Sequence, residues 1–154
     1  MFSRSFKAMA AALLMGSSAM ALAGNDGQVR ANELLNDPDY RQTWQQVVQK
    51  EERLPEWVIN LSGSAEQMNA VTEDGDPYVV GPLCETAKTC LNKRLIVAFS
   101  LDKKDAYAML VDVPAGLPAD KSPTRHADYR FLGEPDEGMQ ALLKEQLKKD
   151  PNWY

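Results

Sequence analysis

The chain has 154 residues, of which 44% are hydrophobic and 25% charged, a composition that fits one globular domain and excludes a collagen-like or largely disordered protein. Its 17 basic and 22 acidic residues give a net charge of −5. Nucleic-acid binding needs a basic face that displaces counterions from phosphates, so this charge argues against a nucleic-acid partner and suits a cationic one.

The first 23 residues have the features of a secretory signal peptide. Arg4 and Lys7 form a positive start, residues 8–15 are apolar, and Ala21-Leu22-Ala23 supplies a small-x-small cleavage site. A membrane anchor would need about 20 continuous apolar residues, and Gly16-Ser17-Ser18 interrupts this run. We therefore expect export to the periplasm, with no membrane attachment after cleavage.

Cleavage leaves a single expected domain over residues 24–154. Loss of Arg4 and Lys7 reduces the 17 basic residues to 15 against 22 acidic ones, so the net charge falls from −5 to −7. Cys84 and Cys90 both remain, and an even pair in an oxidising compartment favours a disulfide bond. A zinc site is disfavoured because Cys-x5-Cys without a nearby His falls short of four ligands, and the spacing is not that of a redox Cys-x-x-Cys. We expect neither a metal nor another cofactor.

The first predicted element of the domain is a helix from Pro38 to about Glu52. Asp37 is a suitable N-cap, and Pro38 suits the first helical position. The apolar face of this helix follows i, i+4, i+7 and i+8 spacing and consists of Tyr40, Trp44, Val47 and Val48. A short apolar anchor follows at residues 57–59, and a polar connection begins at Gly63.

The middle of the chain predicts antiparallel strands. Residues 78–80 follow an Asp-Gly turn, and residues 94–100 are almost continuously apolar, which is typical of a central strand. Residues 106–113 alternate in character, and the short charged link 102–105 joins them to the preceding strand as a hairpin. Residues 129–132 are a fourth candidate strand, after a loop broken by prolines.

The chain closes with a second predicted helix, which has Pro135 in its first turn and is stopped by Asp150-Pro151. Helix, antiparallel strands and helix, in that order, predict an α+β domain with helices over one or both faces of the sheet. The predicted core consists of Trp44, Trp57, Tyr78, Ile96, Val97, Phe99, Met109, Leu142 and Leu143.

Residue patterns typical of catalysis are scarce. The one histidine, His126, lies in a predicted loop without a motif that would make it a catalytic base. There is no phosphate-binding loop, dinucleotide fingerprint or His-Glu-x-x-His. Carboxylate pairs of the glycosidase kind are numerous but unspecific. Glu73-Asp74-Gly75-Asp76 lacks the spacing of a calcium loop and is interpreted as an acidic turn. An enzyme is therefore disfavoured.

The most informative segment lies between the cysteines and reads Glu85, Thr86, Ala87, Lys88 and Thr89. Closing so small a ring stabilises the fold by only about 2 kcal/mol. Its larger effect is to hold a polar loop stiff and exposed, which lowers the entropy cost of inserting the loop into a partner's cleft. A hairpin that is closed by a disulfide bond but has no binding function explains the spacing of the two cysteines equally well.

Several segments resemble the inhibitor of vertebrate lysozyme (Ivy) family, exported bacterial proteins that block C-type lysozymes. They are Leu54-Pro55-Glu56-Trp57-Val58, Pro77-Tyr78-Val79, Arg94-Leu95-Ile96-Val97-Ala98-Phe99, Tyr129-Arg130-Phe131-Leu132-Gly133-Glu134-Pro135 and Asp150-Pro151-Asn152-Trp153. The resemblance covers nearly all of the mature chain. It implies an α+β sandwich in which a short disulfide loop enters the lysozyme cleft.

The loop itself departs from the family pattern. In inhibitory members it reads Cys-Lys-Pro-His-Asp-Cys, and its His reaches the catalytic carboxylates. The loop of this chain is one residue longer and has neither Pro nor His, so only Cys84 and Cys90 carry over. Lys88 offers a cation and Thr86 or Thr89 a hydroxyl, whereas Glu85 would meet the acidic cleft with like charge.

Three binding functions follow from these observations. The first is a periplasmic inhibitor of C-type lysozyme, weakened by loss of the loop His, in which Glu73, Asp74 and Asp76 steer the cationic enzyme. The second is a regulator of the bacterium's own lytic transglycosylases. The third is a periplasmic binding protein of the same fold without inhibitory activity. The sequence is compatible with a monomer or a homodimer.

Overall fold

The computed structural model describes residues 29–154; the predicted signal peptide and residues 24–28 lie outside this range. The elements in chain order are η1 (Ala31–Asn36), α2 (Pro38–Val48), α3 (Glu56–Ile59), β1 (Ser64–Ala65), β2 (Asn69–Glu73), β3 (Asp76–Cys84), β4 (Lys93–Ser100), β5 (Ala106–Asp112), α4 (Pro123–His126), β6 (Asp128–Leu132) and α5 (Glu137–Leu147). This is the predicted α+β class. Among the described residues, no helix has the length and apolar character needed to cross a membrane.

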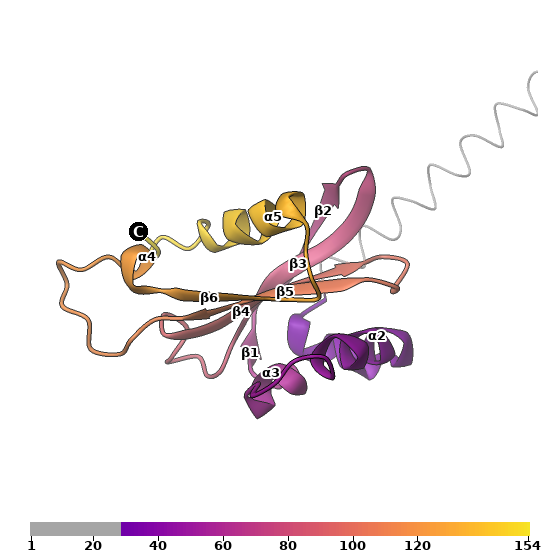
Figure 1. Ribbon diagram of the computed structural model, residues 1–154, viewed down its shortest axis with the longest axis horizontal. Coiled ribbons are helices and arrows are strands. Elements are labelled where there is room, and N and C mark those ends of the chain that lie inside the picture. Colours follow the sequence, from indigo (N-terminus) through magenta and orange to yellow (C-terminus); the bar gives the residue numbers. More distant parts are fainter. Residues whose placement is uncertain (1–28) are drawn as a thin grey trace, which may run out of the picture.

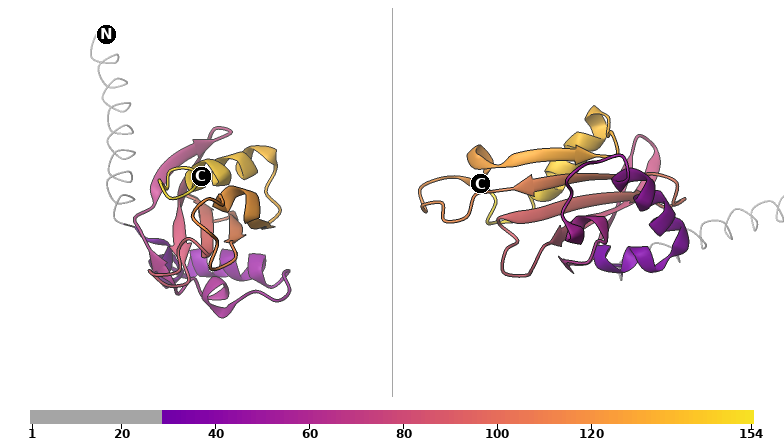
Figure 2. Two further views of the ribbon diagram at one scale, coloured as in Figure 1. Left: turned by 90° about the vertical axis from the view of Figure 1, so that its left-hand side faces the viewer. Right: turned by 60° about the horizontal axis from the view of Figure 1, so that its bottom comes forward.

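All six strands form one antiparallel sheet in the order β1-β3-β4-β5-β6, with β2 also paired to β3. Figures 1 and 2 show α5 on one face of this sheet and η1, α2 and α3 on the other. Helices therefore cover both faces.

Strand β4 divides the hydrophobic core into two clusters. Successive side chains of a strand point to opposite faces, so Val97 and Phe99 join the cluster under α2 whereas Ile96 and Ala98 join the cluster under α5. Burial on both faces explains why β4 is nearly all apolar. The predicted central position of this strand is confirmed.

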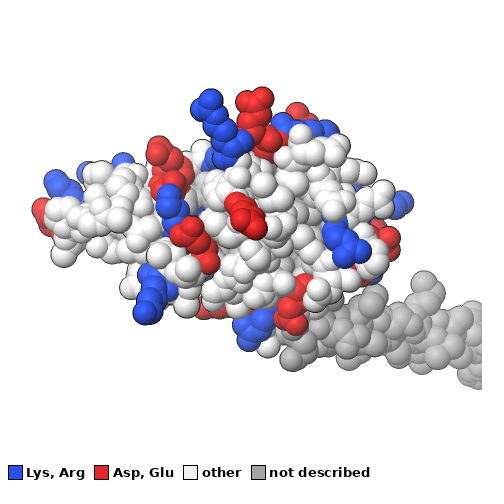
Figure 3. All heavy atoms as spheres, turned by 90° about the horizontal axis from the view of Figure 1, so that it is seen from below, with Lys and Arg blue, Asp and Glu red and all other residues white. Residues whose placement is uncertain are grey.

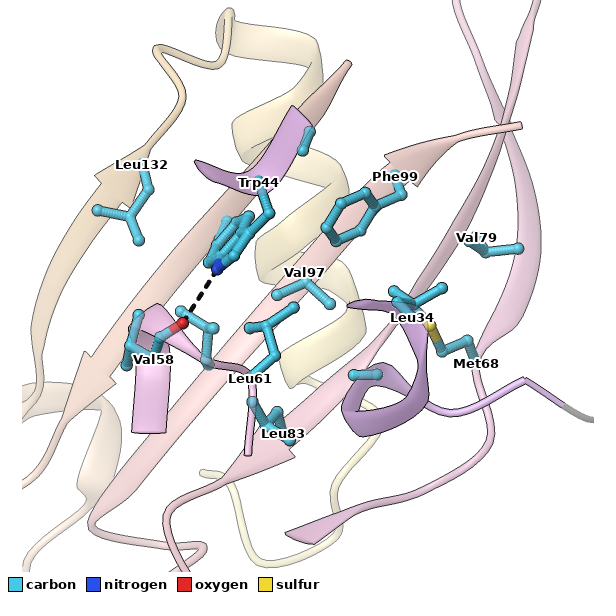
Figure 4. Close-up of a cluster of buried hydrophobic side chains, with 14 of the residues drawn as sticks. Leu34, Trp44, Val58, Leu61, Met68, Val79, Leu83, Val97, Phe99 and Leu132 are labelled. Carbon is cyan, nitrogen blue, oxygen red and sulfur yellow. Dashed lines mark hydrogen bonds between the residues drawn. The ribbon is translucent and has the colours of Figure 1, made fainter. Parts of the chain in front are cut away.

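Trp44 closes the cluster on the α2 side, as Figure 4 shows. Its ring centroid lies 5.7 Å from that of Phe99, and its indole N–H donates to the carbonyl of Val58 at 3.1 Å. A buried tryptophan needs such a partner for its one polar group. This hydrogen bond fixes α3 against α2 and brings the following chain towards β3.

The cluster on the α5 side corrects one predicted core residue. Met139, Leu143 and Leu147 are buried at i, i+4 and i+8 on α5, whereas Leu142 is only partly buried. The i, i+4 row faces the sheet, and Leu142 flanks it. The other predicted core residues are buried.

The helix boundaries also differ from those predicted. Helix α2 ends at Val48 instead of Glu52, and η1, which was not predicted, precedes it. Helix α5 begins at Glu137, one residue after its N-cap: the Asp136 carboxylate accepts a hydrogen bond from the Met139 N–H at 2.8 Å. Pro135 therefore precedes the helix instead of occupying its first turn.

Strand β3 is longer than the predicted strand over residues 78–80. Its partners β1 and β2 lie where the sequence predicts a polar connection. The apolar pattern of β3 breaks at Gly81-Pro82, which hid its continuation to Cys84. The break lies where β3 has no partner on the β1 and β2 side, so the missing N–H of Pro82 costs no ladder hydrogen bond there. A Cβ at Gly81 would come within 2.9 Å of the Met68 side chain, so this close approach requires glycine.

Candidate functional site

The loop between β3 and β4 is closed by a disulfide bond between Cys84 and Cys90, as predicted, with the two Cα atoms 4.9 Å apart. Cys84 is the last residue of β3 and lies opposite Arg94 in the ladder. The loop thus projects from the end of the pair formed by β3 and the central strand β4, and the pairing of these strands holds its base.

Two threonines brace the loop from inside. The Thr86 N–H donates to the Thr89 hydroxyl at 3.1 Å, and the two hydroxyl oxygens lie 2.9 Å apart. The Thr89 N–H donates in turn to the Thr86 carbonyl at 3.2 Å. The bond between the two hydroxyls uses one O–H proton, and the Thr89 hydroxyl also lies 3.4 Å from the Thr86 carbonyl oxygen, to which it can donate. Both hydroxyls that were predicted as donors to a partner therefore have acceptors within the loop.

The tip of the loop is exposed and carries two opposite charges. Glu85, Thr86, Ala87 and Lys88 are all exposed. Neither Lys88 nor Glu85 forms a side-chain hydrogen bond or ion pair within residues 29–154. Lys88 is therefore the available cationic donor at the tip, and Glu85 is an available carboxylate beside it.

The two sides of the loop are held by neighbouring segments. On the Cys84 side, Gly63 packs so closely against the Cys84 carbonyl that a Cβ there would overlap it. On the other side, the Asn92 side-chain amide donates to the carbonyls of Val113 and Pro114 at 3.1 and 3.3 Å. The first contact holds the loop against the segment before β1, and the Asn92 contacts tie it to the segment after β5, which leaves the sheet at the same end.

The predicted steering residues lie elsewhere. Glu73, Asp74 and Asp76 form the turn between β2 and β3, and Figure 1 shows this turn and the disulfide loop at opposite ends of β3. At about 3.3 Å per residue, nine strand residues separate them by roughly 25 Å. The structure gathers the acids into one group but does not bring them to the loop.

This acidic end contains further carboxylates. Asp105 and Asp136 join the three turn acids around a hollow of about 220 Å³, with Tyr78 and Tyr107 in its wall. On the α2 and α3 face, by contrast, basic and acidic side chains are interspersed, as Figure 3 shows. The negative charge is thus concentrated most clearly at the β2–β3 end.

The other sequence candidates stay apart from the loop. His126 is exposed at the end of the one-turn helix α4, where a loop was predicted, and its Nδ1 lies 3.0 Å from the Ser122 carbonyl oxygen. Residues 29–154 contain no group of three or more His, Cys, Asp or Glu side chains placed to hold a metal ion. Among the described residues, the disulfide loop is exposed at its tip, closed covalently and hydrogen-bonded internally.

Comparisons with known proteins point to one family. The model of the family "Inhibitor of vertebrate lysozyme (Ivy)" matches residues 39–149. A Pseudomonas aeruginosa protein named inhibitor of vertebrate lysozyme is 38% identical over 144 residues, which cover 92% of this chain and 93% of that protein.

Two further relatives are uncharacterized proteins. One, from Pseudomonas aeruginosa, is 53% identical over 93% of this chain and 94% of its own length. The other, from Yersinia pestis, is 39% identical over 79% of this chain and 78% of its own length. Because the family model covers most of the chain and the similarity extends over nearly full lengths, this chain belongs to the inhibitor of vertebrate lysozyme (Ivy) family.

Proposed function

We propose that this protein is a periplasmic inhibitor of C-type lysozyme that acts by placing the Cys84–Cys90 loop in the cleft of the enzyme. Membership of the family supports lysozyme inhibition in general. The observation that carries the proposal is the loop itself, which is exposed, closed by a disulfide and braced by Thr86 and Thr89. Such an ordered loop loses little conformational entropy on binding.

The chemistry of the tip makes this inhibitor weak. Lys88 is the available donor for the carboxylates of a lysozyme cleft, because the threonine hydroxyls are used inside the loop. Glu85 meets the same carboxylates with like charge. Each lost hydrogen bond to a charged group costs about 1.5–3 kcal/mol, or roughly ten- to a hundredfold in affinity. We therefore expect weaker inhibition than from a Cys-Lys-Pro-His-Asp-Cys loop.

The test is clearance of a cell-wall suspension by a C-type lysozyme with and without residues 24–154. Lys88→Ala should weaken inhibition, whereas the matched control Lys50→Ala, an exposed lysine after α2, should not. Replacing the five residues between the cysteines with Lys-Pro-His-Asp should strengthen inhibition. Nanomolar inhibition that survives Lys88→Ala would show that this mechanism is wrong.

The divergent tip also favours a second candidate target. A loop without the His, and with Glu85 exposed, fits a lysozyme cleft poorly, so a lytic transglycosylase of the bacterium itself is the alternative partner. The same assay with a purified lytic transglycosylase in place of lysozyme separates the two. Inhibition of neither enzyme would favour a periplasmic binding protein without inhibitory activity.

Export is part of the proposal and has its own test. The basic start, apolar stretch and Ala21-Leu22-Ala23 site support cleavage after residue 23. Mass spectrometry of the periplasmic fraction should find a chain that begins at Gly24 and is lighter by two hydrogens than the dithiol form. A full-length chain confined to the cytoplasm would contradict it.

A further inference from the structure

Among residues 29–154, Arg94 is the one charged residue that is buried, with 5% of its surface exposed. It belongs to β4, directly opposite Cys84 in the ladder. Its Nε donates to the Cys90 carbonyl at 3.0 Å, and its Nη1 donates to the Asp150 carboxylate at 2.8 Å. The guanidinium also lies over the Trp153 ring, 5.7 Å from the centroid.

These contacts join two segments that are distant in the sequence. Cys90 closes the disulfide loop, whereas Asp150 and Trp153 belong to the segment that follows α5. On the Cys84 side the loop is held by the β3–β4 ladder itself, but Cys90 lies before β4 begins. Arg94 therefore supplies the contact by which the Cys90 carbonyl is held to the body of the protein.

Energetic considerations indicate that Arg94 contributes more to the orientation of the loop than to the stability of the fold. A buried guanidinium loses its hydration, and Arg94 Nη2 has no hydrogen-bond partner within residues 29–154. Buried ion pairs are often no more stabilising than apolar side chains of similar volume, while their fixed geometry selects one arrangement. The planar fork of arginine serves that purpose because its donors point in set directions.

We propose that Arg94 is a positioning residue that fixes the orientation of the Cys84–Cys90 loop by tying Cys90 to the C-terminal segment. Its effect on inhibition rests on the proposed function, whereas its effect on the loop does not. Weakening the hydrogen bonds of Arg94 to Cys90 and Asp150 should make the loop more mobile, whereas the centre of the sheet should stay intact.

The test compares Arg94→Lys with a matched control in the protein that carries its native disulfide. Lysine keeps the charge but cannot bond Cys90 and Asp150 in the same fixed geometry. Arg130→Lys is the control, because Arg130 pairs with the Glu51 carboxylate at 3.1 Å on the α2 side of the sheet.

Amide hydrogen exchange measures the loop directly. In Arg94→Lys, the hydrogen-bonded amides of Thr89, Asn92 and Lys93 should exchange about tenfold faster, while those of Ile96 and Met109 keep their rates. Asp150→Asn, which retains an acceptor, should show the same pattern to a smaller extent. Arg130→Lys should leave the loop amides unchanged. Inhibition of the target enzyme should weaken by about tenfold in Arg94→Lys and by less in Asp150→Asn, and it should be unchanged in Arg130→Lys.

Two results would overturn the proposal. One is that the amides of the loop exchange at the wild-type rate in folded Arg94→Lys. The other is that amide exchange becomes faster to the same extent in the loop and in the sheet. If Arg94→Lys does not fold, Asp150→Asn and Trp153→Leu carry the same test, because both side chains are partly exposed. Selective loop acceleration in a protein that inhibits no enzyme would support the positioning role and count against the proposed function alone.

Discussion

Single residues decide how much of the disulfide loop is free for a partner. Thr86 and Thr89 direct their hydroxyls at each other, so their contribution is stiffness instead of recognition. Lys88 and Glu85 remain exposed and have no side-chain partner among the described residues. In the proposed mechanism, the groups of the loop available for recognition are therefore one cation and one neighbouring carboxylate.

Tyr78 lies near the start of β3, away from the disulfide loop, and the pKa of its hydroxyl is raised. Burial, and to a smaller extent the negative charges of Tyr107, Asp105 and Asp76, together raise the pKa of the Tyr78 hydroxyl to about 12. The unfolded chain has the ordinary pKa of about 10. The stabilisation of the neutral form is thus fully present below pH 10 and is lost as the pH rises towards 12.

We expect the free energy of unfolding to fall between pH 10 and 12, and to fall less in Tyr78→Phe. Urea unfolding at several alkaline pH values measures this difference, and absorbance at the phenolate wavelength follows the titration. Tyr154→Phe, at an exposed tyrosine, is the control and should keep the wild-type dependence. A Tyr78→Phe protein with unchanged alkaline behaviour would contradict this assignment.

At the scale of elements, helix α5 distinguishes two adjacent leucines. Leu143 is fully buried against the sheet, whereas Leu142 is partly buried at the flank of the apolar stripe. Leu143→Ala should therefore lower the free energy of unfolding by about 2–5 kcal/mol, because it leaves a cavity in the core. Leu142→Ala should cost clearly less. Denaturant unfolding of both variants measures the contrast, and equal losses would mean that α5 is rotated about its axis.

At the scale of the whole molecule, the disulfide is a local constraint. It closes a short loop, so removing it with Cys84→Ser and Cys90→Ser together should cost about 2 kcal/mol in the chain-entropy model. Domains of this size have about 5–15 kcal/mol of stability, so the double variant should still fold cooperatively. Urea unfolding with an unchanged slope would bear this out; an unfolded double variant would show that the bond supports the entire fold.

The charge distribution of the molecule predicts a salt-dependent rate of association. Glu73, Asp74 and Asp76 lie roughly 25 Å from the loop, well beyond the Debye length of about 8 Å at physiological salt. Their effect on a cationic partner is therefore long-range attraction at low ionic strength, which raises the association rate more than the affinity.

Replacing these three acids with Asn or Gln should slow association at low salt and flatten its salt dependence. Stopped-flow binding to the target enzyme at several ionic strengths measures both. The control replaces the exposed acids Glu33, Asp39 and Asp120, which changes the net charge equally. An equal effect of both triple variants would assign the attraction to net charge instead of to the β2–β3 end.

The sequence by itself determined the features that depend on local pattern. The apolar run of β4 and the helical spacing around Trp44 predict their elements because side-chain periodicity follows from backbone geometry alone. The pairing of Cys84 with Cys90 follows from the even number of cysteines and from the expected export to an oxidising compartment, and the family resemblance follows from residue blocks.

Only the tertiary structure decided the features that depend on contacts between distant segments. The short strands β1 and β2 have little apolar pattern of their own and exist because β3 offers them a ladder. The distance between the acidic turn and the loop is set by the length of β3, which Gly81-Pro82 conceals in the sequence. The ion pair between Arg94 and Asp150 joins positions 56 residues apart. Local periodicity carries no information about such contacts, because they are fixed only when the register of the sheet brings the segments together.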